Sequence, residues 1–575
     1  MLKKTKIIAT IGPSTDATGI LEEMLLAGMN VARFNFSHGT HEEHARRIQM
    51  VRQAAAKVNK PVALMLDTKG PEMRIGKFAN NKVVLKSGQK FILTAKEVVG
   101  NDQIVSINYP GLPQEVSAGD TILLADGLIC LHVDHVDGDD IITTVQNSGE
   151  ISNNKRVACP GKAINLPPLS AKDVADILFG IEQQMDMIAA SFVQRAADVL
   201  AIRKVVEDAG ADMMIIAKIE NAEGVKNIDE ILKVADGIMV ARGDLGVEIP
   251  PEEVPLVQKE LIRKSNQAGK PVITATQMME SMVTNPRPTR AEASDIANAI
   301  MDGTDAIMLS GETAVGCYPV EAVKIMAKIA VRTEAALRYS DLLIQKGALM
   351  QRTTTEAISH ATVQIAHGLG AAAIITATES GYTPRMVSRY RPRAPIVAVT
   401  PHRKTLHRML LLWGVCPLLG AATKDTDEMM ENAVETALAS GLVKEGDLVV
   451  ITAGVPVGTA GTTNLIRVHV VGNILLRGIG IGQKAVTGRV CVAKSPSEVF
   501  RNFRAGDILV VTSVDDETAQ LASKAAAIVA EEGGVTSHAA VVGISYGIPV
   551  IVGVANATQQ LHDGCIVTVD ASRGL

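Results

Sequence analysis

Eight short, almost continuously apolar segments in the first half of the chain constrain its fold more than any other feature. They alternate with stretches of helical patterning and span residues 5–10, 30–36, 61–66, 185–192, 213–219, 236–241, 271–276 and 305–309. Strands that are buried on both faces of a parallel sheet have this composition. Most segments recur after about 25–35 residues, the length of one strand-plus-helix unit, and eight such units predict an α/β fold built on a (β/α)8 TIM barrel.

The long interval between residues 66 and 185 has the pattern of a separate small domain. It contains short alternating runs at residues 82–93 and 120–133, broken by Ser-Gly, Asp-Gly and Gly-Asp pairs. Such pairs are typical of tight turns between antiparallel strands, so we expect an all-β domain inserted after the third barrel strand. An insertion at this point projects from the end of a barrel where active sites form, and it can serve as a lid.

The remainder of the chain predicts two further domains. Strand-like runs at residues 371–376, 395–400 and 447–452 alternate with helical patterns and indicate an α/β domain. A segment rich in Gly and Val follows from residue 474. The expected parts are the first part of the barrel at 1–69, the inserted β lid at 70–166, the second part of the barrel at 167–340, an α/β regulatory domain at 341–472 and an extra C-terminal domain at 474–575.

The composition excludes several classes of protein. Lysine and arginine number 57 against 62 acidic residues, a formal charge of −5, which argues against binding to nucleic acid or an anionic membrane through bulk charge. Aromatic residues make up only 3%, which disfavours a stacking platform for single strands. The six cysteines form no C-x-x-C pair, and neither a signal-peptide pattern nor a membrane-spanning apolar run occurs. We therefore expect a cytoplasmic protein.

Charged side chains accumulate at the carboxyl ends of the predicted barrel strands, where barrel enzymes gather functional groups. Lys218 and Glu220 are two apart, so they point to one face, and at the barrel mouth they would converge with Asp244 of the next strand. Two carboxylates suit Mg²⁺, and Arg33 and Arg74 have the fork-shaped donors that grip phosphoryl oxygens. One such residue alone is usually a solvated or salt-bridged loop residue. Their convergence predicts a site that stabilises an anion during phosphoryl transfer, although the pattern alone leaves the reaction open.

Longer motifs at the same strand ends resemble those of pyruvate kinases. They are Asn30-Val-Ala-Arg-Phe-Asn-Phe-Ser-His-Gly, Leu66-Asp-Thr-Lys-Gly-Pro-Glu-Met-Arg, Ile216-Ala-Lys-Ile-Glu-Asn, Met239-Val-Ala-Arg-Gly-Asp-Leu-Gly, Thr274-Ala-Thr-Gln-Met, Asn285-Pro-Arg-Pro-Thr-Arg-Ala-Glu and Met308-Leu-Ser-Gly-Glu-Thr. The resemblance covers about residues 1–470, and the rest resembles the extra, swivelling β/β/α domain of some bacterial pyruvate kinases. It implies a glycolytic, allosterically regulated homotetramer that transfers the phosphoryl group of phosphoenolpyruvate to ADP, giving ATP and pyruvate.

The resemblance also implies roles for the charged residues at the barrel mouth. Glu220 and Asp244 would hold the divalent ion, Mg²⁺ or Mn²⁺, that bridges the substrate. Lys218 would stabilise charge on the phosphoryl group and on the enolate during transfer, and Arg33 would contact the phosphoryl group.

Two hydroxyl residues are implied in the handling of the carboxylate and the proton. Thr276 and the backbone of Gly243 and Asp244 would contact the substrate carboxylate. Thr276 and Ser310 stand at positions implicated in proton delivery to the enolate carbon. Because an unperturbed threonine is not a strong acid, we expect a chain of water molecules to carry this proton.

A monovalent-cation site is implied at the ends of the second and third strands. Its residues would be Asn35, Ser37, Asp67 and Thr68. In the family, a glutamate at the position of Glu72 is linked to the use of K⁺, whereas a lysine there would supply the positive charge internally. The sequence therefore predicts activation by K⁺.

The nucleotide side of the site is implied from residues of the barrel and of the insertion. Asn35, Ser37 and His38 would line it, together with Arg74 and Lys155. The segment that carries Lys155 departs from the family pattern Lys-Gly-Val-Asn-x-Pro-Gly. Arg156 replaces the glycine of this pattern and Ala158 replaces the asparagine. The extra charge could help to bind nucleotide, or the altered backbone could move Lys155.

The α/β domain contains a loop that resembles the sugar-phosphate effector loop of pyruvate kinases. Its candidate ligands are Thr378, Ser380, Gly381 and Thr383, although an ordinary capped helix would show the same residues. Glu379 stands where enzymes that respond to fructose 1,6-bisphosphate often carry lysine. Because a carboxylate disfavours a second phosphate, we expect activation by a monophosphate such as AMP or a sugar monophosphate.

The last domain contains Thr536-Ser-His538-Ala-Ala, which resembles the phosphohistidine segment of phosphoenolpyruvate-utilising mobile domains. One interpretation is a phosphoenolpyruvate-dependent phosphotransferase that works through His538, but no ATP-grasp pattern is recognisable in the chain. A metabolite sensor without activity is a second alternative, and the presence of Lys218, Glu220 and Asp244 argues against it. We expect His538 to be catalytically idle, because pyruvate kinase chemistry needs no carrier histidine.

Overall fold

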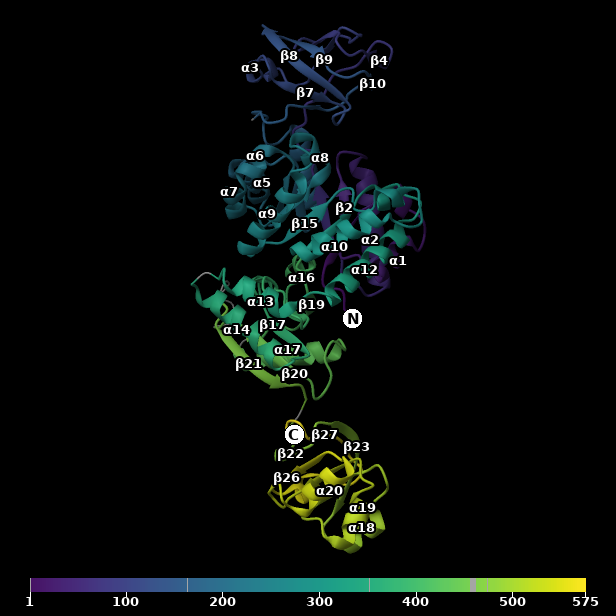
Figure 1. Ribbon diagram of the computed structural model, residues 1–575, viewed down its shortest axis with the longest axis vertical. Coiled ribbons are helices and arrows are strands. Elements are labelled where there is room, and N and C mark those ends of the chain that lie inside the picture. The colour runs from purple at the N-terminus through teal and green to yellow at the C-terminus, as the bar shows by residue number, and fades with distance from the viewer. Residues whose placement is uncertain (1, 163, 351, 424, 456–461, 473) are drawn as a thin grey trace. The chain divides into compact units, whose positions relative to one another are not determined.

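The computed structural model describes residues 2–162, 164–350, 352–423, 425–455, 462–472 and 474–575 (Figure 1). The chain divides into two compact units. The first covers Met1–Ala437 and Val450–Arg467, and the second covers Leu438–Val449 and Val468–Leu575. Within the described ranges, no helix combines the length and the apolar character that a membrane span needs.

Eight parallel strands close into a barrel, as the apolar segments predict (Figure 1). In chain order they are β1 (Lys6–Thr10), β2 (Val31–Asn35), β3 (Ala63–Asp67), β12 (Met187–Ala190), β13 (Met214–Ile219), β14 (Gly237–Ala241), β15 (Val272–Ala275) and β16 (Ala306–Leu309). The first strand pairs with the last, with Lys6 opposite Ala306, and this pairing removes the sheet edges. The predicted barrel fold is confirmed, and each predicted segment overlaps one strand.

Side chains of the barrel strands alternate between the barrel interior and the surrounding helices. An inner cluster includes Ile8, Val31, Met65, Ala189, Ile216, Met239, Ile273 and Met308. A second, larger cluster contains their neighbours in sequence, such as Ile7, Ala32 and Ile215, packed against the helices. Because the side-chain period of a strand is two, a residue two positions beyond the last inner-cluster member of a strand lies on the same face, at the barrel mouth.

Helices follow the barrel strands, and several of them have recognisable capping residues. They are α1 (Ile20–Ala27), α2 (His41–Lys57), α4 (Ala171–Glu182), α5 (Ala196–Asp208), α6 (Ala222–Lys226), α7 (Ile228–Val234), α8 (Arg242–Glu248), α9 (Val254–Gln267), α10 (Arg290–Asp302), α11 (Gly311–Ala314) and α12 (Pro319–Ala335). Thr40 caps α2 and Thr289 caps α10, each with a glutamate three residues later that returns a hydrogen bond. The αL conformation of Gly303, with φ of 102°, ends α10.

The insertion after β3 is mostly antiparallel. One sheet has the order β11 (Val157–Ala158), β7 (Thr121–Leu124), β8 (Ile129–Asp137), β9 (Asp140–Val145), β5 (Lys90–Thr94) and β6 (Ile104–Ser106). Hairpins run from β7 to β9, while β5 and β6 pair in parallel. A second pairs β10 (Gly149–Ser152) with β4 (Lys82–Leu85), and the short helix α3 (Leu112–Glu115) completes the segment. The insertion has an apolar core of its own, which includes Phe91, Leu131 and Ile141.

A mixed sheet with flanking helices follows the barrel in the chain. Its strand order is β19 (Val415–Leu419), β18 (Ile396–Thr400), β17 (Ala373–Ala377), β20 (Leu448–Ala453) and β21 (Leu465–Val470). The helices are α13 (Tyr339–Gly347), α14 (Thr354–Gly368), α15 (Tyr382–Ser388), α16 (Arg403–Met409) and α17 (Thr426–Ala439). The sequence predicted three of these strands and missed β19 and β21.

The second unit contains a six-stranded mixed sheet. Its order is β22 (Ile479–Ile481), β26 (Val550–Val552), β25 (Ala527–Ala530), β24 (Ile508–Val511), β23 (Ala485–Ala493) and β27 (Ile566–Asp570). Its helices are α18 (Pro496–Asn502), α19 (Asp516–Ala522), α20 (His538–Tyr546) and α21 (Ala557–Gln560).

Candidate active site

Polar side chains meet at the carboxyl ends of neighbouring barrel strands. Five of these residues follow members of the inner cluster by two positions, and they are Arg33, Asp67, Ser191, Lys218 and Ser310. Their side chains therefore face the barrel mouth for the same reason that their predecessors fill its interior.

A buried network of charges joins four of the predicted residues. Arg33 Nε donates to Asp67 Oδ2 at 2.6 Å. Lys218 Nζ lies 3.0 Å from Asp67 Oδ1 and 3.1 Å from Glu220 Oε1. The side chains of Asp67 and Glu220 are only 1% exposed, so water screens these interactions weakly. The convergence of Lys218 and Glu220 on one face, which their spacing predicts, is observed.

The network shifts the protonation equilibria of its members. The pKa of Glu220 is raised to about 7. Burial is the largest cause, Lys218 acts in the opposite direction, and the nearby Asp244 adds to the increase. Burial opposes the charge on Lys218, but Asp67 and Glu220 raise its pKa to about 12. Arg33 and Lys218 lower the pKa of Asp67 despite its burial. Lys218 is thus a permanent cation. For Glu220, burial and the nearby Asp244 outweigh the effect of Lys218, so its pKa stays above the usual range of a carboxyl.

Asp244 completes a pair of carboxyls suited to a divalent ion. It lies in the first turn of α8, directly after β14, and influences the pKa of Glu220. The described residues contain no cluster of three or more His, Cys, Asp or Glu side chains arranged to hold a metal. Mg²⁺ needs no such cluster, because one or two carboxylates bind it together with water and substrate oxygens. A buried carboxyl with a raised pKa beside a second carboxyl therefore fits a divalent cation.

Thr276 is fixed beside the start of α8. Gly243 N donates to Thr276 Oγ1 at 2.7 Å, and Arg242 Nη2 donates to the Thr276 carbonyl oxygen at 2.8 Å. Arg242 is itself paired with Asp295 at 2.6 Å. Thr276 has a φ of 67°, a left-handed conformation that is costly for a β-branched residue and that these contacts maintain. The structure therefore brings Thr276 and Gly243 together.

Ser310 is oriented by a buried carboxylate. Glu312 accepts hydrogen bonds from Ser310 N at 2.7 Å and from Met279 N at 3.0 Å, and it is 1% exposed. These bonds tie the turn after β16 to the loop after β15. Ser310 itself is half-buried.

The predicted K⁺ ligands come from the adjacent strands β2 and β3. Asn35 and Asp67 are direct neighbours in the parallel ladder. Asn35 Oδ1 accepts a hydrogen bond from Ser37 N at 3.1 Å, and Thr68 Oγ1 accepts one from Ser191 N at 3.1 Å. Carboxylate, amide and hydroxyl oxygens are donors that fit an alkali cation. The ladder brings Asn35 and Asp67 together, while Ser37 is exposed.

The predicted nucleotide residues lie on two elements. Ser37 and His38 are exposed after β2. Arg74 Nη2 lies 2.6 Å from Glu72 Oε2, and its Nη1 donates to the carbonyl oxygen of Asn154 at 2.8 Å. Lys155 is exposed next to Asn154. Arg74 and Lys155 are thus neighbours in the insertion, and Arg74 is engaged by Glu72.

Comparison with known proteins decides which family has this arrangement. The chain matches the family model "Pyruvate kinase, barrel domain" over residues 2–323, "Pyruvate kinase, alpha/beta domain" over 356–469 and "PEP-utilising enzyme, mobile domain" over 503–574. A pyruvate kinase of Geobacillus stearothermophilus is 56% identical over 577 residues, covering 100% of this chain and 98% of the relative. Pyruvate kinases of Bacillus licheniformis and Staphylococcus aureus are 53% and 48% identical, with the same two coverages. The chain belongs to the pyruvate kinase family.

Membership of the pyruvate kinase family supports the glycolytic enzyme and not the phosphotransferase alternative through His538. His538 is exposed at the first position of α20, and its Nε2 lies 3.2 Å from Asp516 Oδ1. Ser537 caps the helix through a hydrogen bond from Ala540 N to its Oγ. The matched mobile domain therefore presents a capped helix at this histidine.

Two residues that contact the active site of this pyruvate kinase family member were missed as site residues. Ser191 Oγ lies 2.7 Å from Lys218 Nζ and donates to the carbonyl oxygen of Thr68 at 2.6 Å. Its position at the end of the fourth predicted strand was the available signal. Arg156 was noted only as a departure from the family pattern, yet it pairs with Asp244. No spacing in the sequence indicates this contact, because it joins the insertion to α8.

The predicted effector loop of the pyruvate kinase family lies between β17 and α15. Thr378 Oγ1 accepts a hydrogen bond from Gly381 N at 2.9 Å, and Gly381 has a φ of 80° that favours glycine. Ser380 is exposed, while Thr383 is buried and bonded to Thr463. Glu379 Oε2 lies 2.6 Å from His402 Nε2. Thr378 and Gly381 are brought together, whereas Thr383 faces the interior of the domain.

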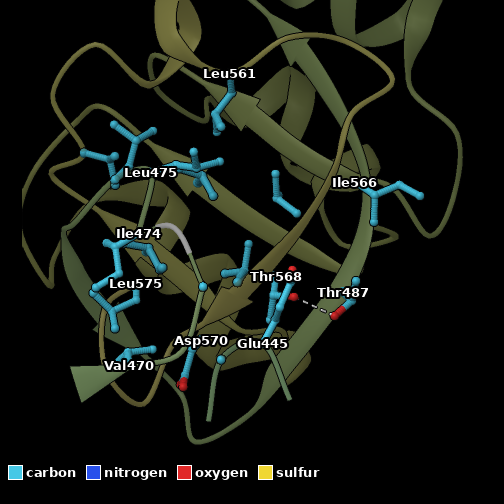
Figure 2. A pocket seen from close by; sticks show the side chains of 18 of the residues that line it. Glu445, Val470, Ile474, Leu475, Thr487, Leu561, Ile566, Thr568, Asp570 and Leu575 are labelled. Atoms are coloured by element: carbon cyan, nitrogen blue, oxygen red, sulfur yellow. Dashed lines mark hydrogen bonds between the residues drawn. The ribbon is translucent and has the colours of Figure 1, made fainter. Parts of the chain in front are cut away.

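A cavity of about 320 Å³ lies in the second unit (Figure 2). Aliphatic side chains dominate its lining, among them Val470, Ile474, Leu475, Leu561, Ile566 and Leu575. Thr487 and Thr568 are joined by a hydroxyl hydrogen bond of 2.8 Å at one side. Such a lining suits an apolar group and provides no cation for a phosphate.

Proposed function

We propose that this protein transfers the phosphoryl group of phosphoenolpyruvate to ADP at the mouth of its barrel, giving ATP and pyruvate in glycolysis in the cytoplasm. The observation that carries the proposal is the position of Lys218, which lies 3.0 Å from Asp67 and 3.1 Å from Glu220 at the end of β13. A permanent cation beside Glu220, one of the two carboxyls assigned to the divalent ion, is suited to a phosphoryl group that transfers between two oxygens.

Binding of phosphoenolpyruvate is assigned to fixed donors. Arg33 is held by Asp67 and by Thr10 Oγ1, which receives a 2.8 Å hydrogen bond from Arg33 Nη1. Its guanidinium is thereby pre-oriented toward the phosphoryl group. Thr276 and the first turn of α8 would hold the carboxylate end of the substrate. Fixed donors need no reorganisation when the charge moves during transfer.

Glu220 and Asp244 would hold the divalent ion that this family uses, Mg²⁺ or Mn²⁺. When bound, the ion neutralises charge on the phosphoryl and carboxylate oxygens of the substrate. Asn35, Ser37, Asp67 and Thr68 would hold K⁺, which adds a further positive charge near the phosphoryl group. Asp67 is buried and pairs with Lys218, so it would position this lysine with or without bound K⁺.

Lys218 would stabilise the enolate oxygen as the phosphoryl group leaves. Protonation of the enolate carbon then yields pyruvate, and this step favours ATP formation. Thr276 and Ser310 are the hydroxyls assigned to the proton path, through water, because neither hydroxyl is acidic enough to act alone. Glu312 would act as a positioning residue for Ser310 through its hydrogen bond from Ser310 N.

A coupled assay with lactate dehydrogenase, ADP, Mg²⁺ and K⁺ tests the proposal directly. Formation of pyruvate that depends on phosphoenolpyruvate and ADP is expected. A protein that binds phosphoenolpyruvate without producing pyruvate would be a sensor, and a protein that instead acquires an acid-labile phosphate on His538 would be the phosphotransferase. Either result would contradict the assignment.

The proposal extends to regulation, assembly and the division into domains. A monophosphate effector, AMP or a sugar monophosphate, is assigned to the loop of Thr378, Ser380, Gly381 and Thr383. The enzyme is proposed to be a homotetramer, as is typical of its family. The domain division is proposed as 1–69 and 167–340 for the barrel, 70–166 for the lid, 341–472 for the regulatory domain and 474–575 for the extra domain.

A further inference from the structure

Arg156 connects the inserted lid to the barrel mouth. Its backbone belongs to the lid, because its carbonyl oxygen accepts a hydrogen bond from Ala125 N at 3.0 Å and the next residue, Val157, donates to Met73 O at 2.8 Å. Its side chain leaves the lid and is only 9% exposed. A buried guanidinium needs anionic or aromatic partners, so the contacts of this side chain indicate its role.

The guanidinium of Arg156 contacts one half of the candidate metal site directly. Its Nη1 donates to Asp244 Oδ1, and its Nη2 lies 3.7 Å from Glu248 Oε1. Both acidic residues belong to α8, one turn apart. Asp244 is the more exposed partner, with 36% of its side chain accessible, so solvent and ions can still reach it.

The same guanidinium reaches the other half of the site through Phe192. It lies 4.8 Å from the centre of the Phe192 ring, a cation–π distance. The backbone N–H of Phe192 donates to Glu220 Oε2 at 2.6 Å, and Phe192 adopts a φ of 57°, which is strained for an aromatic residue. The arginine therefore packs against the segment that orients Glu220 while it neutralises Asp244.

A guanidinium and a divalent ion on the carboxylate of Asp244 compete for the same negative charge. The mouth already holds the cations Arg33 and Lys218, so Arg156 and a bound metal would add like charges next to one another. Glycine is the residue of the family pattern at position 156, and it has no side chain that could reach Asp244. The competition between a guanidinium and a divalent ion for Asp244 therefore arises from Arg156 of this chain.

We propose that Arg156 is an internal counter-cation that occupies Asp244 in the metal-free enzyme, so that the divalent ion must displace it and thereby free this part of the lid from α8. The inference rests on the proposed function, because it takes Glu220 and Asp244 as the metal ligands. Metal entry and lid position are then linked through one side chain, and Arg156 lowers the metal affinity of the free enzyme.

Binding of Mn²⁺ to the full-length enzyme without substrate or nucleotide tests this link. Free Mn²⁺ is measured by electron paramagnetic resonance for the wild type, Arg156→Gln, Arg156→Lys and Arg195→Gln. Loss of a charged hydrogen bond to Asp244 is expected to make Arg156→Gln bind Mn²⁺ about tenfold more tightly than the wild type. Arg156→Lys keeps the positive charge and should bind Mn²⁺ as weakly as the wild type. Arg195 is the control, because its side chain is 46% exposed and its Nε lies 4.0 Å from Asp198 Oδ1, and Arg195→Gln should bind Mn²⁺ like the wild type.

Hydrogen exchange supplies a second measurement that does not depend on turnover. Mn²⁺ should increase amide exchange around residues 154–158 in the wild type, while Arg156→Gln should exchange rapidly there with or without the ion. Unchanged or weaker Mn²⁺ binding by Arg156→Gln would overturn the inference, as would wild-type exchange behaviour in that variant. Circular dichroism confirms that each variant is folded.

Asp244→Asn separates this inference from the function on which it rests. If Asp244→Asn loses Mn²⁺ binding while Arg156→Gln binds like the wild type, only the role of Arg156 is wrong. If Asp244→Asn binds Mn²⁺ like the wild type, the metal site itself is wrong, and the inference falls with it.

Discussion

Lys218 illustrates how burial and pairing can keep a lysine charged inside a protein. Burial lowers the pKa of a lysine, but two carboxylates about 3 Å away raise the pKa of Lys218 to about 12. We predict that Lys218→Met reduces turnover by on the order of 10³-fold and leaves phosphoenolpyruvate binding largely intact, because the lysine acts on charge that develops in the transition state. The coupled assay gives turnover, and equilibrium dialysis with labelled phosphoenolpyruvate gives binding.

Lys226→Met is the matched control for Lys218→Met. Lys226 lies on α6, seven residues beyond the end of β13, and its side chain is 73% exposed. Its replacement should leave both turnover and binding unchanged. If Lys218→Met instead weakened binding as strongly as turnover, the lysine would be a ground-state binding residue and the assigned role would be wrong.

Glu72 leads to a second prediction at the level of single residues. Glu72 is an anion that accepts hydrogen bonds from Arg74 Nε at 2.9 Å and from Arg74 Nη2 at 2.6 Å, so it adds no positive charge to the site and engages the charge of Arg74. We expect activity in KCl to exceed activity in tetramethylammonium chloride, at equal ionic strength, by about tenfold or more, because a bound cation compensates the substrate's charge. Glu72→Lys should raise the activity that remains without K⁺. Equal activity of the wild type in both salts would contradict the prediction.

At the level of elements, the sequence predicts what local periodicity controls. All eight barrel strands are apolar runs with helices between them, so their number and positions could be predicted. The edge strand β21 was missed because its residues are half-buried or exposed, which gives no continuous apolar run. The pairing of Lys218 with Glu220 follows from a period of two within one strand. The contact of Arg156 with Asp244 joins residues 88 positions apart in different domains, and no local pattern indicates it.

The packing of α13 against α9 gives a prediction about stability. Lys346 Nζ donates to Asn266 Oδ1 at 3.3 Å, and the same oxygen accepts a hydrogen bond from Arg391 Nη2 at 2.9 Å. Burial, and then the neighbouring Arg391, lower the pKa of Lys346 to about 7. The unfolded chain therefore binds one more proton than the folded chain between about pH 7 and pH 10, and stability from this group rises with pH across that window.

Lys346→Met tests the predicted increase of stability with pH. The variant should be more stable than the wild type by about 1–3 kcal/mol near pH 6.5, because it removes the cost of a buried charge, and this advantage should shrink toward pH 9. Apparent Tm measured by differential scanning fluorimetry over this range gives the comparison. Lys328→Met, on the exposed face of α12, is the control and should show a constant difference. A constant difference for Lys346→Met would show that its ammonium is not desolvated in the fold.

On the scale of the first unit as a whole, two barrel strands lead from contacts with the α/β segment to the barrel mouth. His407 of α16 lies 3.0 Å from Asp186, just before β12, and Arg391 lies 2.8 Å from Asp305, just before β16. The far ends of these strands are followed by Ser191 and Ser310 in the candidate active site. If the α/β segment binds an effector as proposed, these two strands are the contacts through which a shift of that segment would reach the barrel mouth.

The identity of that effector is the prediction that depends on the whole molecule. The carboxylate of Glu379, 2.6 Å from His402, lies in the loop between Thr378 and Gly381 and would repel a second phosphate bound there. We expect AMP or ribose 5-phosphate to lower the half-saturating concentration of phosphoenolpyruvate by about two- to tenfold, with little response to fructose 1,6-bisphosphate. Glu379→Lys should gain a response to the bisphosphate, whereas Glu431→Lys, an exposed change on α17, should not. Saturation kinetics with each effector decide the matter, and activation of the wild type by the bisphosphate alone would contradict a role for this carboxylate in selectivity.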